Sequence, residues 1–416
     1  MSPRANEQAR PAYVGTPGEV FCAFFKLGLT SFGGPIAHLG YFREELVVRR
    51  KWIDEAGYAD LVALCQFLPG PASSQAGFAL GLLRGGPLGA LAAWTAFTLP
   101  SAIALMVFAR GAAVFAGPLG SGLLHSLKIV AVAVVAQAVW GMAQTLCPDR
   151  QRAGIALFAA LIVSYMAGPA GQVAAILTGG LAGLWFCRGA PANIPAHLSI
   201  PVSRRAGALM LALFFVLLIL LPVIRAGFPA QGLALFDSFY RSGALVFGGG
   251  HVVLPLLEAE RVQSGWVSQD SFLAGYGAAQ AIPGPLFTFA AYLGWMMDPE
   301  PDGAAGAIIC LIAIFLPGLL LLAGALPYWD ALRTRPRAQA AMRGANAAVV
   351  GLLGAALCHL VWTGAILSIY DFALALLGFI LLTVWKTPPW IVVIVLAAGG
   401  AALALNLDPA HWPSRP

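Results

Sequence analysis

Long uninterrupted apolar runs dominate this chain and restrict its fold more than any other feature. A helix needs about 20 apolar residues to cross a membrane. Runs near that length lie at 87–109, 120–146, 207–224, 304–325, 345–365 and 389–406, with three more inside 154–187 and 366–385. Only 10% of the 416 residues are charged, against about a quarter in an ordinary globular chain. The sequence therefore predicts an all-α polytopic membrane protein embedded in a lipid bilayer, and it argues against soluble enzymes and DNA-binding domains.

The remaining composition argues against several kinds of chemistry. The net charge of +6 is typical of Lys and Arg in short cytoplasmic loops, so we expect no nucleic-acid partner. The six cysteines stand singly, without metal-ligand spacing, which predicts neither disulfides nor zinc. Phosphate-loop, HExxH, calcium-loop and GxSxG motifs are absent from the sequence. We therefore expect a protein that is not an enzyme and needs no cofactor, and that draws on an ion gradient or the membrane potential.

A second set of apolar segments is too short to cross a membrane. These segments are 19–32, 57–68, 71–84, 236–249, 271–282 and 285–297. Each abuts a Gly/Pro break, and apolar segments of this length are typical of broken or re-entrant helices.

The breaks recur in order along the chain, which indicates an internal duplication. Phe32-Gly33-Gly34-Pro35 corresponds to Phe247-Gly248-Gly249-Gly250 at a spacing of 215 residues, and Gln66–Pro71 corresponds to Gln280–Pro285 at a spacing of 214. Leu99-Pro100 and Leu316-Pro317 continue the series. The predicted organisation is a cytoplasmic segment 1–17, a first repeat 18–187, a basic linker with one extra transmembrane helix 188–232, a second repeat 233–406 and a tail 407–416.

Loop charges predict that the two repeats are inverted relative to each other. The loop 43–51 sums to +2, whereas its counterpart 258–266 sums to −1. Later in the repeat the bias reverses, because 333–343 holds four Arg and its counterpart 111–127 holds no Lys or Arg. Basic loops stay in the cytoplasm, so equivalent loops should lie on opposite faces. We expect a cytoplasmic N-terminus and a periplasmic C-terminus. Inverted repeats with paired broken helices are typical of secondary transporters, which bind substrate near the midplane.

The Pro-Gly-Pro and Phe-Gly-Gly breaks are candidate anion sites. Helices that begin after Pro71 and Pro285 would direct free backbone amides at a ligand, and hydroxyl groups beside them could add donors. The plain alternative is packing, because Gly and Pro are common in membrane helices. The candidate binding residues are Ser31, Gly33, Gly34, Gly70, Ser73, Ser74, Gly248, Gly249, Gly284 and Thr288, and the candidate helix breaks are Pro35, Pro69, Pro71, Pro283 and Pro285.

Side chains with charge or amide groups complete the candidate site. Lys26 and Arg241 occupy equivalent positions inside short apolar runs, where a cation is costly unless it is paired or functional. We predict that they attract a dianion, the alternative being salt bridges with nearby acids. Gln66 and Gln280 are equivalent amide donors, or else bond between helices. His38 and Asp60 are candidates for proton coupling. The alternatives are that His38 is a packing residue and that Asp60 is a solvated helix cap.

The sequences FKLGLTSFGGPIAHLGYFREELV, WIDEAGYADLVALCQFLPGPASSQAG, ALVFGGGHVVLPLLEAE and AIPGPLFTFAAYLG together resemble the chromate ion transporter family, in its two-domain form. The resemblance covers roughly residues 18–400. It implies a carrier of the bacterial inner membrane that exports chromate and confers chromate resistance, with sulfate as an isosteric competitor. An importer or exchanger of sulfate or a related oxyanion, and an anion channel, stay open as alternatives, as does a homodimer. Position 250 is Gly where the first repeat has Pro35, and the first repeat is richer in polar residues beside its breaks. We therefore expect the first repeat to make more of the contacts with substrate than the second.

Overall fold

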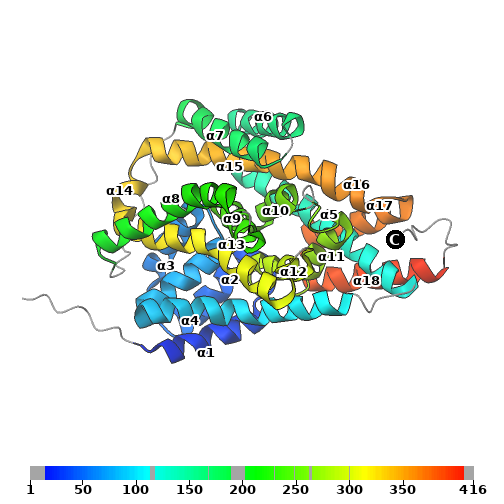
Figure 1. Cartoon of the computed structure of the whole chain (residues 1–416), viewed down its shortest axis with the longest axis horizontal. Coiled ribbons are helices and arrows are strands. Elements are labelled where there is room, and N and C mark those ends of the chain that lie inside the picture. Colours follow the sequence, from blue (N-terminus) through cyan, green and yellow to red (C-terminus); the bar gives the residue numbers. More distant parts are fainter. Residues whose placement is uncertain are drawn as a thin grey trace, which may run out of the picture.

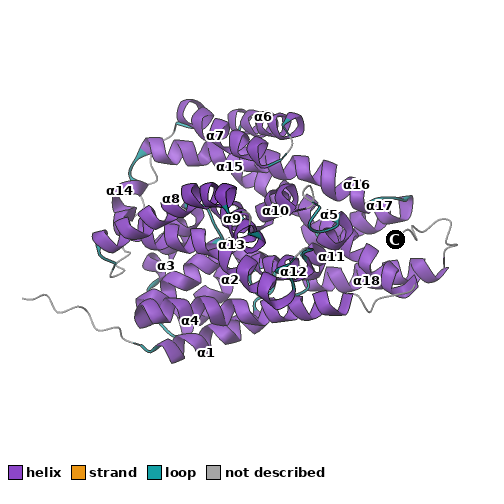
Figure 2. Ribbon diagram, in the orientation of Figure 1, coloured by secondary structure: helices purple, strands orange, loops and turns teal. Residues whose placement is uncertain are grey.

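The computed structural model of the chain describes residues 15–112, 118–166, 168–188, 202–228, 230–247, 249–261, 265–298 and 300–406. Within these ranges every regular element is a helix and there is no β-strand (Figure 2). Five helices are long and apolar enough to cross a membrane: Ala72–Gly111, Gly122–Leu146, Pro169–Phe186, Arg204–Gly227 and Gly303–Arg333. The prediction of an all-α polytopic membrane protein is therefore confirmed.

The first repeat contains seven α-helices in the order short, short, short, long, long, medium, medium. Their bounds are α1 Pro17–Thr30, α2 Gly34–Phe42, α3 Glu55–Phe67, α4 Ala72–Ala112, α5 Pro118–Leu146, α6 Arg150–Tyr165 and α7 Pro169–Phe186. A single helix, α8 (Arg204–Gly227), follows and leaves most of its apolar surface exposed.

The elements of the second repeat follow a matching order. They are α9 Gln231–Ala244, α10 Val253–Arg261, α11 Gln269–Ala279, α12 Phe289–Met296, α13 Gly303–Ala325, α14 Trp329–Arg333, α15 Pro336–Ala356, α16 Thr363–Ala365, α17 Ile369–Thr383 and α18 Pro389–Asn406. Short 3₁₀ turns, Gly250–Val252 and Leu286–Thr288, precede α10 and α12. As predicted, the short apolar segments become short helices that begin or end at the Gly/Pro breaks.

Close glycine contacts fold the helix after each Pro-Gly-Pro break into a hairpin. The chain turns within α4 at Gly85 and Gly86, whose dihedral angles are not helical. A Cβ added at Gly81 would lie 2.5 Å from the Gly89 carbonyl oxygen, so the two arms of α4 pack backbone against backbone. In the second repeat α12 and α13 form the equivalent hairpin, where Gly294 and Gly306 make the same contact. Glycine permits this approach because it has no Cβ.

The two repeats exchange their last helices. From the first repeat, α6 and α7 pack against α15, and from the second repeat, α17 and α18 pack against α5. Figure 1 shows α6 and α7 along the outer side of α15 at one edge of the molecule, and α1 beside α4 at the opposite edge. Neither repeat can therefore bury its helices alone, and the core of the protein lies between them.

Two basic stretches that we treated as loops are partly helical. Arg43–Arg49 continues α2 as a π-helical turn, and α15 begins at Pro336, inside the stretch 333–343. The predicted span 345–365 therefore starts nine residues after the true beginning of α15. Proline is favoured in the first turn of a helix, but the arginines that follow Pro336 lowered the local hydropathy and concealed the start.

Candidate functional site

The Pro-Gly-Pro break of each repeat is hydrogen-bonded to the residue before the Phe-Gly-Gly break of the other repeat. The Gly70 amide donates to the Val246 carbonyl at 2.7 Å, and the Gly284 amide donates to the Ser31 carbonyl at 2.9 Å. Val246 lies 215 residues after Ser31, and Gly284 lies 214 after Gly70, so these are equivalent bonds. The four breaks therefore meet at one place between the repeats.

Both Pro-Gly-Pro glycines have backbone conformations that other residues rarely adopt. The φ angles are +123° at Gly70 and +108° at Gly284. A Cβ at Gly70 would lie 3.0 Å from the Gly318 Cα atom, and one at Gly284 would lie 2.8 Å from the Ser101 hydroxyl oxygen. Ser101 and Gly318 are themselves equivalent, following Pro100 and Pro317. Each break is thus fitted against the proline-containing helix of the opposite repeat.

These bonds change the expected role of the glycine amides. We expected the breaks to direct free amides at an anion, but the Gly70 and Gly284 amides are already used between the repeats. The helix α4 begins at Ala72, directly after Pro71, whereas Pro285 is followed by the 3₁₀ turn Leu286–Thr288 and α12 begins only at Phe289. The amides of the first turn of α4 remain without intrahelical acceptors, and these can still serve a ligand.

Buried polar side chains gather around the breaks of the first repeat. Ser31, His38, Ser73, Ser74 and Gln75 are each at most 3% exposed. His38 Nδ1 and the Ser73 hydroxyl oxygen are 3.3 Å apart. Gln75 is held by its amide nitrogen, which donates to the Pro69 carbonyl at 3.0 Å and to the Gly318 carbonyl at 2.9 Å.

Several polar atoms in this group have no hydrogen-bond partner among the described residues. They are Ser31 Oγ, His38 Nε2, Ser74 Oγ, Gln75 Oε1 and Thr98 Oγ1, together with Trp94 Nε1 one turn before Thr98. An unpartnered buried polar atom costs about 1–3 kcal/mol. A concentration of such atoms beside two helix breaks is typical of a site that a polar ligand completes. Thr98 and Trp94 were not among the predicted site residues.

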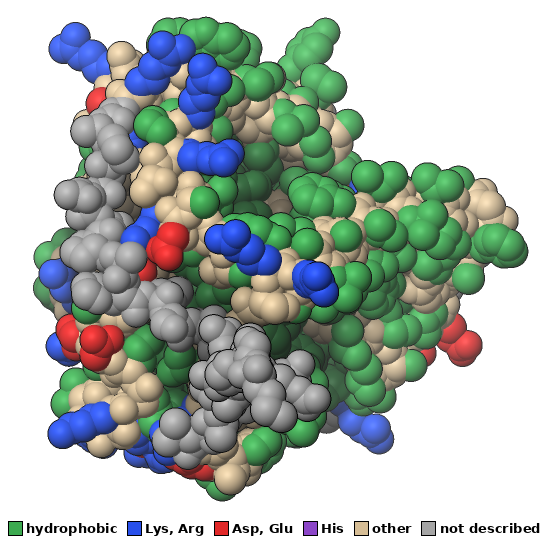
Figure 3. Space-filling model, turned by 90° about the vertical axis from the view of Figure 1, so that its left-hand side faces the viewer, with side chains coloured by type: hydrophobic (Ala, Val, Ile, Leu, Met, Phe, Trp, Pro, Cys, Tyr) green, Lys and Arg blue, Asp and Glu red, His purple; other side chains and the backbone are tan. Residues whose placement is uncertain are grey.

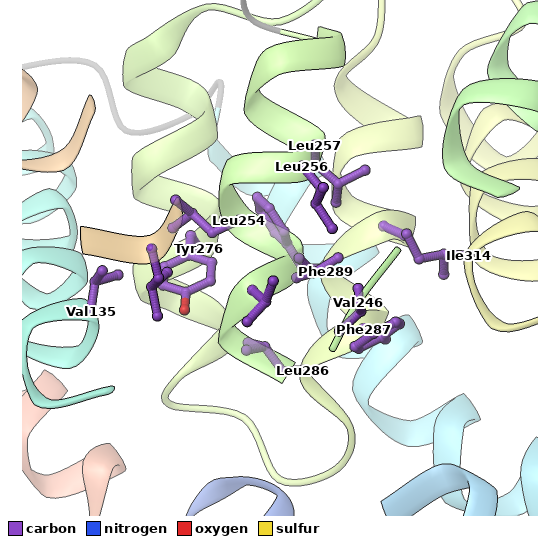
Figure 4. Close-up of a cluster of buried hydrophobic side chains, with 14 of the residues drawn as sticks. Val135, Val246, Leu254, Leu256, Leu257, Tyr276, Leu286, Phe287, Phe289 and Ile314 are labelled. Carbon is purple, nitrogen blue, oxygen red and sulfur yellow. The ribbon is translucent and has the colours of Figure 1, made fainter. Parts of the chain in front are cut away.

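With one exception, Thr288 at the position equivalent to Ser74, the equivalent positions in the second repeat are apolar. Ser31 corresponds to Val246, His38 to Val253, Ser73 to Phe287, Gln75 to Phe289 and Thr98 to Phe315. All five second-repeat side chains are at most 2% exposed and belong to one hydrophobic cluster. Figure 4 shows Val246, Phe287 and Phe289 among the other apolar side chains of this cluster. The two repeats share a backbone plan but differ in what they can bind.

The other predicted polar residues near the breaks make internal contacts or are exposed. The Thr288 hydroxyl donates to the Pro285 carbonyl at 2.7 Å, and the Gln280 amide nitrogen donates to the Tyr276 carbonyl at 3.4 Å. Gln66 is exposed, as is Gly33.

The remaining break residues are placed as follows. Gly34 and Gly249 are half-buried, and Gly248 lies outside the described residues. Pro35 lies in the first turn of α2, and Pro285 directly precedes the 3₁₀ turn. Pro69, Pro71 and Pro283 lie between helices. The expected breaks are therefore present.

The two intramembrane cations are both paired with glutamates. Lys26 Nζ contacts Glu45 at 3.0 Å, and Arg241 contacts Glu260 at 3.1 Å and Asp237 at 3.1 Å. Glu45 and Glu260 follow their cations by the same 19 residues, so this ion pair is itself duplicated. Burial favours the neutral form of Glu45, but hydrogen bonds from Lys26 and Arg50 outweigh it and hold the Glu45 pKa below its usual value.

The two candidates for proton coupling lie in different surroundings. His38 is part of the polar group of the first repeat. Asp60 is fully buried and accepts hydrogen bonds from Trp329 at 2.7 Å and from Arg333 at 3.4 Å. The alternative of a solvated cap for Asp60 is therefore wrong, because α14 of the other repeat covers the carboxylate.

One buried charge pair escaped the sequence analysis. His125 Nε2 lies 3.0 Å from Asp371 Oδ1 across the exchanged helices α5 and α17, and both side chains are buried. Asp371 also accepts the Leu367 and Ser368 amides as part of a capping box. The spacing of Ser368 and Asp371 signals a helix cap, but no local pattern connects either residue to His125. No group of three or more His, Cys, Asp or Glu suited to a metal occurs in the described part of the chain.

A sequence model of the chromate transporter family matches two segments of this chain, residues 18–184 and 233–403. The chain belongs to the chromate transporter family. It is 30% identical to the chromate transport protein of Pseudomonas aeruginosa, over 95% of this chain and 94% of that protein. It is 28% identical to a probable chromate transport protein of Synechococcus elongatus, over 90% and 93% of the two chains.

A shorter member is an uncharacterized transporter of Bacillus subtilis, which is 32% identical over 39% of this chain and 83% of its own length. No solved structure matches this chromate transporter.

Proposed function

We propose that this protein exports chromate from the cytoplasm across the inner membrane and so confers chromate resistance. Membership of the chromate transporter family carries the choice of substrate. The buried polar group of the first repeat supports a site for a tetrahedral oxyanion, because most of its unpartnered atoms are hydroxyl, indole or imidazole groups that can donate hydrogen bonds.

The proposed site is asymmetric and carries little charge of its own. Ser31, Ser74 and Thr98 donate hydrogen bonds from their hydroxyl groups to the oxyanion, and His38, oriented by Ser73, donates one from its Nε2 atom. First-turn amides of α4 add the favourable end of the helix dipole. Because Lys26 and Arg241 are paired with carboxylates, they act mainly on the electrostatic potential that the approaching anion meets, and less by direct contact with the anion. The packed aromatic side chains of the second repeat close the opposite wall.

Inversion of the two repeats accounts for alternating access. The equivalent bonds Gly70–Val246 and Gly284–Ser31 support a substrate site between the repeats at the proposed midplane, and we assign to α8 the odd crossing that an inversion requires. The N-terminus then lies in the cytoplasm and the C-terminus in the periplasm. Substrate passes between the repeats as one moves against the other.

The membrane potential is sufficient to drive export. Moving one charge through 100 mV is worth about 2.3 kcal/mol, so a dianion leaving a cell across ~150 mV gains roughly 7 kcal/mol. Exchange for a proton is the second mode of coupling that we propose, and His38 is its candidate group because it lies within the binding site.

Purified protein in liposomes tests the proposal directly. We expect radiolabelled chromate to accumulate when a potassium gradient with valinomycin makes the lumen positive, and to leave when the polarity is reversed. A pH step without a potential separates proton exchange from simple charge movement. Protein-free liposomes are the control, and chromate flux equal to theirs would reject the proposal.

The same preparation separates the alternatives. An importer or exchanger of sulfate would accumulate labelled sulfate more efficiently than chromate. A channel would carry currents beyond the turnover of a carrier and would show no acceleration of chromate uptake by chromate inside the liposome. The buried polar group favours the carrier, since its hydroxyl and imidazole donors are at most 2% exposed.

A further inference from the structure

One buried charged contact between the repeats lies outside the proposed binding site. Asp60 of α3 is fully buried and faces α14 of the other repeat. Its Oδ1 atom accepts the Trp329 indole N–H at 2.7 Å and an Arg333 N–H at 3.4 Å. Its Oδ2 atom makes no hydrogen bond to any residue that the structure describes.

The two donors are held in place independently of Asp60. Arg333 also contacts Asp330 at 3.0 Å, and its carbonyl accepts a hydrogen bond from Gln339. The Trp329 ring lies 5.6 Å from the Phe67 ring. An indole N–H and a guanidinium that converge on one buried point provide the donors that bind an oxyanion.

Asp60 fills this point only in part. A guanidinium binds a carboxylate best through two parallel hydrogen bonds of about 2.7–2.9 Å. The Arg333–Asp60 contact is single and long, and it shares its oxygen with Trp329. A tetrahedral dianion offers more oxygen atoms and more charge to the same two donors. An oxyanion can therefore bind the two donors through separate oxygen atoms, which the single shared oxygen of Asp60 does not do.

The position of this contact fits the start of a transport path. α3 ends at Phe67 and leads directly to the Pro69-Gly70-Pro71 break, so Asp60 lies about 10 Å from the end of its helix at 1.5 Å per residue. Figure 3 shows the face of the molecule that carries α14, with Lys and Arg side chains spread over it. Positive charge on this face raises the local concentration of anions.

We propose that Trp329 and Arg333 form a capture site for the transported oxyanion, and that the Asp60 carboxylate occupies this site when substrate is absent. Arriving substrate takes over the two donors and releases Asp60. Because Asp60 and α14 belong to different repeats, this exchange also frees one contact between the repeats. The capture site rests on the proposed transport of chromate.

Opposite effects of two substitutions test the capture site in liposomes. Asp60→Asn keeps the shape and the acceptor for Trp329 but removes the competing charge, so we expect the half-saturating chromate concentration to fall about fivefold. Arg333→Gln removes the principal donor, and the half-saturating concentration should rise at least tenfold. The matched control is Glu55→Gln, which removes a carboxylate from the same helix α3 at an exposed position, and it should change the value less than twofold.

A purely structural ion pair gives a different pattern. Asp60→Asn and Arg333→Gln would then alter the half-saturating concentration in the same direction, or not at all, and either result would overturn the capture site. If Arg333→Gln does not insert stably, Asp60→Asn decides alone, because only a displaced competitor lowers the concentration required. Wild-type protein without chromate flux would instead reject the transport function itself, so the two failures are distinguishable.

Discussion

The Gly70 amide donates a hydrogen bond of 2.7 Å to the Val246 carbonyl, which joins the Pro-Gly-Pro break of one repeat to the Phe-Gly-Gly break of the other. The equivalent bond from Gly284 to Ser31 has nearly the same length, 2.9 Å. Together they hold four interrupted helices at one place. Any movement of one repeat against the other must rearrange at least one of these bonds, so we expect transport to be sensitive to both.

Substituting either Pro-Gly-Pro glycine should stop transport. Gly70→Ala and Gly284→Ala force a side chain into a conformation with positive φ, which costs about 1–3 kcal/mol, and place Cβ atoms within 3.0 Å of neighbouring atoms. We expect chromate uptake to fall more than tenfold, with a lower melting temperature of the purified protein.

The matched control for these glycines is Gly40→Ala. Gly40 lies in α2 without a positive φ, and its added Cβ meets nothing within 4 Å. Alanine favours a helix by about 0.5–1 kcal/mol over glycine, so this variant should retain its uptake and its melting temperature. Equal losses in Gly40→Ala and Gly70→Ala would contradict the importance of the break geometry.

Removing unpartnered hydroxyl groups from the first repeat should stabilise the protein while weakening transport. Ser74→Ala and Thr98→Val each eliminate a buried oxygen without a described partner, which relieves about 1 kcal/mol. The same oxygens are proposed ligands of chromate, so the half-saturating concentration should rise several-fold. Thermal unfolding and uptake by the same preparations provide the measurement.

The control for the hydroxyl variants is Phe315→Ala, at the position equivalent to Thr98. Phe315 is fully buried among apolar side chains, and such a truncation costs about 3–5 kcal/mol. This variant should lose stability. If Thr98→Val instead lowers the melting temperature and leaves uptake unchanged, Thr98 is a packing residue and not a ligand.

Equivalent cations of the two repeats should differ in their contribution to stability. Arg241→Gln takes a cation from two largely buried carboxylates, Glu260 (10% exposed) and Asp237 (1% exposed), while Arg225 still contacts Asp237 at 3.3 Å. Losing hydrogen bonds to charged groups costs about 1.5–3 kcal/mol. Lys26 is 55% exposed, so Lys26→Gln should cost at most about 1 kcal/mol. Melting in detergent measures both, and equal losses would show that the two ion pairs share one environment. Both variants should raise the half-saturating chromate concentration.

Accessibility to a membrane-impermeant thiol reagent tests the inverted arrangement. Val48→Cys reports on the basic stretch of the first repeat, where Val48 is 46% exposed. Asp298→Cys reports on the second repeat beside Trp266, whose carbonyl accepts the Asp298 amide. We expect the reagent to reach residue 48 only in everted vesicles and residue 298 only in intact cells. Labelling of both from one side would rule out inversion.

Local patterns predicted the membrane character, the short helices and the breaks between them. Apolar run length decides whether a helix can cross lipid, and Gly and Pro act on the backbone of their own neighbourhood. These properties belong to contiguous residues and can be read without a structure. The start of α15 at Pro336 was misplaced because arginines near the end of a helix lower the local hydropathy to a value typical of a loop.

Contacts between distant residues could not be predicted in this way. Lys26 has Glu19 within reach along the sequence, yet it pairs with Glu45, while Glu19 pairs with Arg84. Asp60 pairs with Arg333, which lies 273 residues away. The choice of partner depends on how helices cross, because a salt bridge forms between groups that packing brings together and not between neighbours in the chain.

The sequence by itself determined that this is a helical membrane protein built from two related repeats with interrupted helices, since apolar length and Gly/Pro spacing act locally. Only the tertiary structure decided that the Gly70 and Gly284 amides bind the opposite repeat, that the intramembrane cations are paired with carboxylates, and that the unpartnered polar atoms around the breaks belong mainly to the first repeat. Those outcomes depend on which surfaces meet when the repeats exchange their last helices. A linear pattern of residues does not contain that information.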